Sequence, residues 1–186
     1  MPGGGTNGGM AAELQVVTHH LEMTSLAELR PSRGGFPEVS LQLVTAFPPW
    51  FYRDLYRGVG RSYNWFRRYH WSDADIQLHF VDPSVKLYVL YDCGDAAGFA
   101  ELRRREADDS VEIQYFGLLP RFVGRGLGGH LLTAATRAAW ATGPRRVWLH
   151  TCSLDHPAAL ANYQARGFRI YRTEAGTEPA LEVEAV

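Results

Sequence analysis

GLLPRFVGRGLGGHLL, residues 117–132, is the stretch of sequence that decides the fold. Apolar residues alternate as in a strand before it and recur at helical spacing after it. Between the two, Gly124, Gly126, Gly128 and Gly129 allow left-handed backbone angles and close approach of a ligand. Because the first amides of a helix lack internal partners, the turn predicts a phosphate or pyrophosphate site, to which Arg125 is expected to add a charged contact.

The position of this turn excludes two common classes of nucleotide-binding protein. A dinucleotide site follows the first strand of a parallel sheet and has an acidic residue about 20 positions later. Here the turn follows a predicted antiparallel meander, and residues 142–147 contain no acid. A phosphate-loop NTPase needs Gly-Lys-Ser/Thr, which the sequence lacks. Nucleotide hydrolysis is therefore excluded.

The remaining periodicity predicts an α/β (α+β) fold with a mixed sheet. A strand, a helix and a strand in succession, at 111–118, 126–142 and 146–152, imply one parallel strand pair with a right-handed crossover. The other expected strands are 14–23, 38–45, 85–91, 96–103 and 168–173. The other expected helices are 49–57, 72–80 with Ser72 or Asp73 as its cap, and one that begins at Asp155 or His156 and ends at Gly167.

Composition limits the partners of the chain. With 186 residues and 46% hydrophobic residues, we expect a flexible N-terminal tail over 1–12 and a single domain over 13–186. Nineteen basic against 20 acidic residues leave no overall positive field, so no nucleic acid partner is expected. No apolar run reaches the ~18 residues of a membrane span, so we expect no membrane partner. Two cysteines and no export signal favour a cytoplasmic location.

A second motif lies at residues 156–168, which read HPAALANYQARGF. Together the two segments resemble the GNAT acetyltransferase superfamily, over about residues 85–172. The pattern Gln/Arg-x-x-Gly-x-Gly/Ala of that family falls on residues 123–128, with Val123 at its first position. The family's Asn-x-x-Ala-x-x-Leu-Tyr-x-x-x-Gly-Phe pattern is matched with His156 in place of Asn and Asn162 in place of Leu.

This resemblance implies a mostly antiparallel central sheet flanked by helices, with the fourth and fifth strands splayed apart. It also implies acetyl-CoA as the acetyl donor, with no metal. The residues expected to bind this cofactor are Phe116, Gly117, Leu118, Gly124, Arg125, Gly126, Leu127, Gly128, Gly129 and Asn162.

The resemblance also gives candidates for proton transfer. Tyr163 is expected to be the catalytic acid that protonates the leaving thiolate, although a Tyr packed between helix and sheet is the alternative. Glu112 is the candidate base, because it lies eleven positions before Val123, where the histone acetyltransferases carry their catalytic glutamate. A solvated Glu112 is equally consistent with the pattern, and His150 or a water relay are rivals, with Glu101 a weaker one.

Nine aromatic residues lie between residues 49 and 71. The resemblance places the acceptor site beside the first two helices, so these side chains could line a pocket for an aromatic or cationic amine, although core packing is the commoner role. We therefore expect an N-acetyltransferase that acts on a small-molecule amine by direct attack in a ternary complex, as a monomer or homodimer. The alternatives are acetylation of a protein Lys or N-terminal amine, and a non-catalytic acyl-CoA-sensing module.

Overall fold

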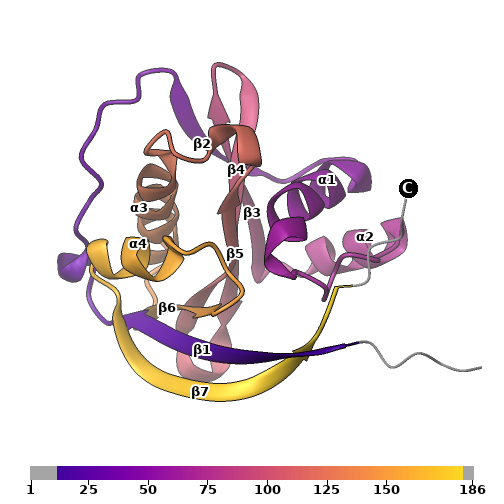
Figure 1. Cartoon of the computed structure of the whole chain (residues 1–186). Helices are drawn as coiled ribbons and strands as arrows, with labels where there is room; N and C mark the ends of the chain where they lie inside the picture. The colour runs from indigo at the N-terminus through magenta and orange to yellow at the C-terminus, as the bar shows by residue number, and fades with distance from the viewer. Residues whose placement is uncertain (1–11, 182–186) are drawn as a thin grey trace, which may run out of the picture.

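The computed structural model describes residues 12–181, which form one seven-stranded sheet with helices on both faces (Figure 1). The tail expected over residues 1–12 lies, apart from Ala12, outside the described residues. The strands are β1 Glu13–Met23, β2 Val39–Val44, β3 Val85–Asp92, β4 Asp95–Arg105, β5 Ser110–Leu118, β6 Arg146–Cys152 and β7 Arg169–Pro179. The helices are α1 Pro49–Gly60, α2 Asp73–Val81, α3 Leu127–Trp140 and α4 Ala159–Ala165.

The strand order β2-β3-β4-β5-β6-β1-β7 confirms the expected mixed, mostly antiparallel sheet. Only the pair β5–β6, which α3 connects, is parallel, as expected for a strand-helix-strand crossover. In Figure 1, α3 and α4 cover one face of the sheet, and α1 and α2 cover the other. None of the described helices is long and apolar enough to cross a membrane.

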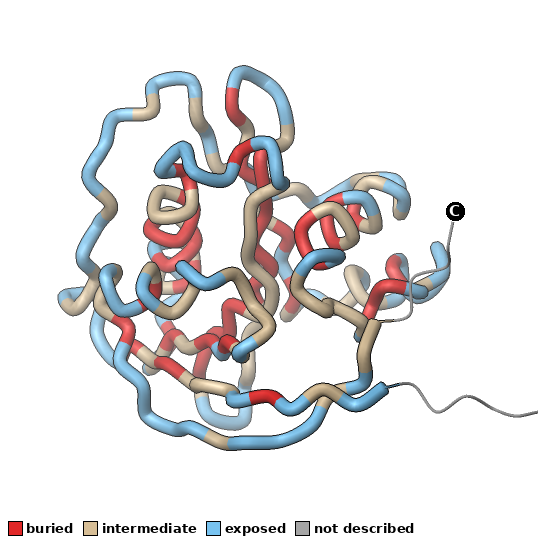
Figure 2. The backbone as a smooth tube through the Cα atoms, viewed as in Figure 1, coloured by how far each residue is buried: buried red, intermediate tan, exposed pale blue. Residues whose placement is uncertain are grey.

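The apolar periodicity of the helices accounts for this layered arrangement. In α3, Leu131, Leu132 and Ala135 have no exposed surface and pack against the sheet. On the opposite face, Tyr52 and Tyr56 of α1 pack over β3 and β4. Figure 2 shows the buried residues gathered between these helices and the central strands, while β7 at the edge is largely exposed. The start of α2 is fixed by the expected cap, since the side chains of Ser72 and Asp75 form a capping box.

The glycine turn, which follows the fourth strand in the family that the sequence resembles, here follows β5, so the splay expected between the fourth and fifth strands falls between β5 and β6. The two strands pair over only three residue pairs, from Ser110↔Arg146 to Glu112↔Trp148. Beyond Glu112 they diverge, so the edge of β5 that faces β6 has no strand partner there. A shift of register opposite Glu101 and Leu102 leaves Gln114 as the extra residue of a bulge at the same level.

Two expectations were wrong in detail. The last strand does not end near residue 173 but continues to Pro179, because β1 pairs with it along almost its whole length. The helix α4 starts at Ala159 and has no side-chain cap. Asp155 instead accepts hydrogen bonds from Thr151 and Cys152, and His156 accepts one from the amide of Ala158, so both side chains are used in the turns before the helix.

A test of the backbone at the end of α4 uses its glycine. Gly167 has φ +103°, and a Cβ there would lie 2.1 Å from the carbonyl oxygen of Glu28. We expect Gly167→Ala to lower the free energy of unfolding by at least about 2 kcal/mol, measured by urea denaturation. Gly176→Ala is the control, because no atom of residues 12–181 lies within 4 Å of a Cβ at that position. Equal stability of the two variants would contradict the described packing.

Candidate active site

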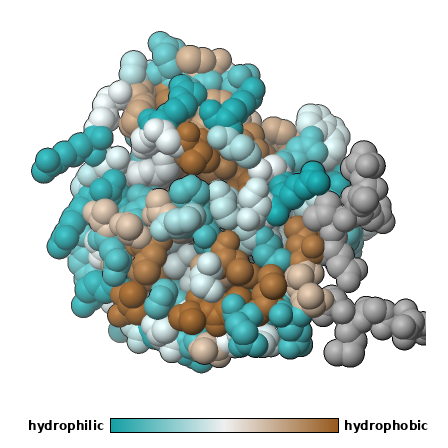
Figure 3. Space-filling model, viewed as in Figure 1, coloured by the Kyte–Doolittle hydropathy of each residue, from teal (hydrophilic) through white to brown (hydrophobic). Residues whose placement is uncertain are grey.

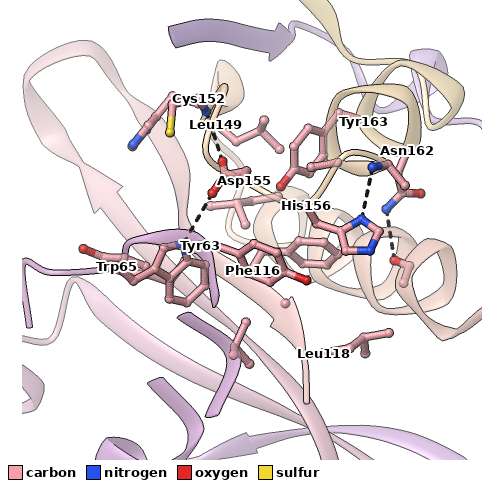
Figure 4. A pocket seen from close by; sticks show the side chains of 18 of the residues that line it. Tyr63, Trp65, Phe116, Leu118, Leu149, Cys152, Asp155, His156, Asn162 and Tyr163 are labelled. Carbon is pink, nitrogen blue, oxygen red and sulfur yellow. Dashed lines mark hydrogen bonds between the residues drawn. The ribbon is translucent and has the colours of Figure 1, made fainter. Parts of the chain in front are cut away.

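A cavity of about 640 Å³ lies where β5 and β6 diverge. Its walls come from β5, the glycine turn before α3, α4 with the loop before it, and the connection from α1 to α2. Figure 4 shows Tyr163 and Asn162 on one side of it and Trp65 on the other, while the rings of Tyr63 and His156 contact each other edge to face, with centroids 5.8 Å apart. The molecular surface in Figure 3 has several separate apolar patches between polar side chains, so surface hydropathy alone does not mark the cavity.

The glycine turn presents backbone amides to this cavity. Gly124 and Gly126 adopt left-handed angles, with φ 84° and 80°. Gly126 is the N-cap of α3, and no side chain caps the helix or places an acid in its first turn. The amides at the start of α3 are therefore available to an anion, as the sequence predicted. The glycines that line the cavity here are Gly124, Gly126, Gly128 and Gly129.

The other residues expected to bind the cofactor divide into two groups. Phe116, Gly117 and Leu118 line the cavity on the unpaired edge of β5, and Asn162 lines it from α4. Two members of the set do not line it. Arg125 forms an ion pair with Asp92 at 2.7 Å, and the side chain of Leu127 is buried in the core, so Leu127 can contribute only its amide.

The sequence reasoning missed two groups beside the first turn of α3. A Cβ at Gly129 would lie 2.7 Å from a terminal guanidinium nitrogen of Arg166 and 2.9 Å from the hydroxyl of Ser32. The Nε atom of Arg166 is buried and makes no hydrogen bond to the described residues. Arg166 and Ser32 thus lie beside the uncapped amides of α3, although neither residue lines the cavity. Arg166 stands at a variable position of the second motif, so the pattern gave no signal for it.

Tyr163 lines the cavity from α4, with only 6% of its surface exposed. Its ring lies edge-on to Phe116, with 5.9 Å between ring centroids. Burial raises the pKa of Tyr163, and the negative charge of Asp155 raises it further. The hydroxyl is therefore protonated at neutral pH and available as a proton donor in the cavity.

Glu112 is buried but does not line the cavity. One carboxylate oxygen pairs with the guanidinium of Arg105, and the other lies 3.7 Å from Nδ1 of His150. His150 does line the cavity, and its side chain is 45% exposed. Desolvation lowers the pKa of His150, although the nearby carboxylate of Glu112 opposes this shift. The imidazole is therefore neutral at pH 7, and Glu112 approaches it from outside the cavity.

Glu101 lies away from the cavity, in a buried network on the α1 side of the sheet. It has no exposed surface and binds Arg68 at 2.5 Å, Tyr52 at 2.8 Å and His79 at 2.9 Å. Burial by itself would raise the pKa of Glu101, but His79 and Arg68 outweigh it and lower that pKa. Arg68 also donates to the side chain of Gln114 at 3.0 Å. Glu101 thus positions residues of the cavity wall.

Only part of the aromatic run of residues 50–71 lines the cavity. The side chains that line it are Tyr56, Tyr63, Trp65 and Phe66. Others in the run serve the core, as Tyr52 does, or lie on the surface, as Trp50 does. The carboxylates that line the cavity are Asp155 and Glu178.

Comparison with known proteins gives a consistent result. A family model described as the acetyltransferase (GNAT) family matches residues 47–168. Comparison with curated proteins gave no match. Among solved structures, a GCN5-related N-acetyltransferase from Sphaerobacter thermophilus has a TM-score of 0.61 at 17% identity, over 95% of this chain and 56% of that one. One from Kribbella flavida has a TM-score of 0.62 at 17% identity, over 92% and 61%.

A spermidine N-acetyltransferase from Vibrio cholerae has a TM-score of 0.57 at 17% identity, over 71% of this chain and 80% of that one. At such identities the structures share the fold alone. The chain spans only about half to two thirds of the length of the first structures it matches.

A binding experiment can separate the two arginines near the turn. We expect Arg166→Gln to weaken CoA binding about tenfold, because it removes a charge-assisted contact beside the first turn of α3. Arg125→Gln is the matched control and should change the affinity less than about twofold, since Arg125 is held by Asp92. Isothermal titration calorimetry with CoA measures both, and the reverse ranking would contradict this assignment.

Proposed function

Because the chain belongs to the GNAT acetyltransferase family, we propose that it is an N-acetyltransferase that transfers an acetyl group from acetyl-CoA to the primary amine of a small molecule. The transfer proceeds by direct attack in a ternary complex. One observation carries this proposal: a single cavity joins the amides at the start of α3, the hydroxyl of Tyr163 and the imidazole of His150. We also infer that the enzyme is cytoplasmic and works as a monomer or homodimer, without a metal.

Acetyl-CoA supplies an acetyl group activated as a thioester. The uncapped amides of α3, with Arg166 and Ser32, are suited to its pyrophosphate. The unpaired edge of β5, residues 113–118, offers N–H and C=O groups to the amides of the pantetheine arm. A backbone N–H near Leu118 would stabilise the negative charge that develops on the acetyl oxygen.

Proton transfer needs a base for the amine and an acid for the sulfur. His150 lines the cavity in its neutral form and accepts a proton from the attacking amine. Glu112 has no direct access to the cavity, so we assign it the role of holding His150 and stabilising the imidazolium that forms. Tyr163 donates its proton to the departing thiolate and recovers one from solvent after the products leave.

The size and lining of the cavity favour a small acceptor. We assign the acceptor half of the cavity to its aromatic side chains, Tyr56, Tyr63, Trp65 and Phe66, and its two carboxylates, Asp155 and Glu178, a combination suited to amines. Thiol release from acetyl-CoA should occur with a panel of small primary amines and not with Lys-containing peptides. Turnover of peptides alone would replace this proposal with protein acetylation, and CoA binding without turnover of either would favour an acyl-CoA sensor.

Tyr163→Phe tests the acid. The substitution keeps the ring that packs on Phe116 and removes the only group able to protonate the thiolate from this position. We expect kcat to fall about 10- to 100-fold while the affinity for CoA changes little. Steady-state kinetics and CoA titration measure the two quantities. An unchanged kcat would show that water protonates the thiolate.

The pH dependence tests the base. A neutral imidazole is needed, so kcat/KM should rise as pH increases through the pKa of His150, which lies below its ordinary value. His150→Gln should remove this inflection. Glu112→Gln should move it to lower pH, because the carboxylate that raises the pKa of His150 is lost. If Glu112 itself is the base, Glu112→Gln removes the inflection and His150→Gln retains it.

A further inference from the structure

We propose that the acceptor carries a second positive charge, and that Asp155 binds this charge while the other end of the molecule is acetylated. The substrate class is then a primary amine with a separate ammonium or guanidinium group, such as an aliphatic diamine. This inference rests on the proposed function and specifies its acceptor.

The carboxylate of Asp155 faces the cavity without a cationic partner. One oxygen accepts hydrogen bonds from the hydroxyl of Thr151 at 2.6 Å and the amide of Cys152 at 3.0 Å. The other oxygen lies 3.4 Å from the indole nitrogen of Trp65 (Figure 4). All three donors are neutral, and no Lys, Arg or His of residues 12–181 forms an ion pair with Asp155. Its full negative charge is therefore available to a ligand.

The other carboxylate of the acceptor half, Glu178, differs from Asp155 because it has a basic neighbour. Glu178 on β7 lies 3.8 Å from the guanidinium of Arg67, which is itself largely exposed. The charge of Glu178 is thus offset by a basic side chain of the same wall, whereas that of Asp155 is not. The two residues form a natural pair for comparison.

Aromatic rings adjoin Asp155. The indole of Trp65 is fixed between Tyr56 and Tyr115, at centroid distances of 5.3 and 5.1 Å, and its N–H is directed to Asp155. Tyr63 lines the cavity from the same connection. A carboxylate attracts an organic cation by charge, and the neighbouring aromatic rings favour a ligand with an alkyl chain over a hydrated inorganic ion.

Asp155 is suited to an amine that does not react. A carboxylate in contact with an amine favours its ammonium form and so raises its pKa, which suppresses nucleophilic attack. The attacking amine must be neutral, and the neutral imidazole of His150 accepts its proton. Asp155 and Tyr163 line the same cavity, so a cation bound by Asp155 shares that cavity with the reacting centre. Asp155 thus keeps one amine in its ammonium form, and His150 takes the proton of the other amine.

The test compares acceptors of equal length that differ in one terminal group. Putrescine and cadaverine are assayed against n-butylamine, n-pentylamine and the corresponding aminoalcohols, with kcat/KM for a diamine halved to account for its two amines. We expect the diamines to exceed the monoamines and aminoalcohols by about tenfold or more. Asp155→Asn should reduce this ratio to near one, whereas Glu178→Gln should largely preserve it.

The opposite results overturn the proposal. Wild-type protein that turns over monoamines as well as diamines has no site for a second charge. An equal loss for monoamines and diamines in Asp155→Asn would assign Asp155 to the reacting amine. Trp65→Phe keeps a ring and removes the N–H, so this variant should retain the diamine preference. If Trp65→Phe loses the preference, the preference depends on the conformation of the loop and not on the charge of Asp155.

A binding readout separates this inference from the proposed function. Cadaverine and n-pentylamine are titrated by calorimetry into protein saturated with CoA. If no amine is acetylated but cadaverine binds at least about tenfold more tightly than n-pentylamine, and Asp155→Asn removes the difference, the charge site stands and the proposed reaction does not. If amines are acetylated but the two ligands bind equally, the reaction stands and the charge site does not.

Discussion

The divergence of β5 from β6 after three residue pairs is the constraint on which the site depends. A parallel pair that continued would use the backbone groups of residues 113–118 within the sheet and would close the space between the strands. Because the pair stops, one edge of β5 remains free for a ligand, and the cavity opens between that edge and Leu149. The glycine turn at one end and His150 at the other then face the same space.

The buried ion pair between Arg68 and Glu101 supports the other wall. Burying two charges is costly unless both are well hydrogen-bonded, and here Tyr52, His79 and Gln114 complete their partners. The pair also connects two parts of the wall. Arg68 lies in the α1–α2 connection, which carries Tyr63 and Trp65, and it donates a hydrogen bond to Gln114 at the bulge of β5. The aromatic wall of the cavity is thus held by polar contacts beneath it and not by apolar packing alone.

Sequence predicted the order and type of the elements, because periodicity and the glycine turn are local signals. Most of the residues that the sequence predicted to bind the cofactor also line one cavity, because the two short motifs that contain Gly124 and Tyr163 meet there. Sequence did not predict that Arg125 turns to Asp92 or that Glu112 lies behind His150, because both depend on side-chain directions across neighbouring strands. Arg166 and Asp155 acquire their surroundings only from segments far away in the chain, Ser32 in one case and Trp65 in the other.

The position of β1 between β6 and β7 has a consequence for how the enzyme matures. Among the described strands β1 is synthesised first and β7 last, yet each supplies a residue that lines the cavity, Thr18 and Glu178 respectively. The side chain of Asn64 also binds the backbone at Pro179 and Leu181. A ribosome-bound chain that lacks β7 can already form the glycine turn and the central strands, but the wall of its cavity is incomplete. Contacts of such long range form late in folding, so the glycine turn can assemble before β7 completes the cavity.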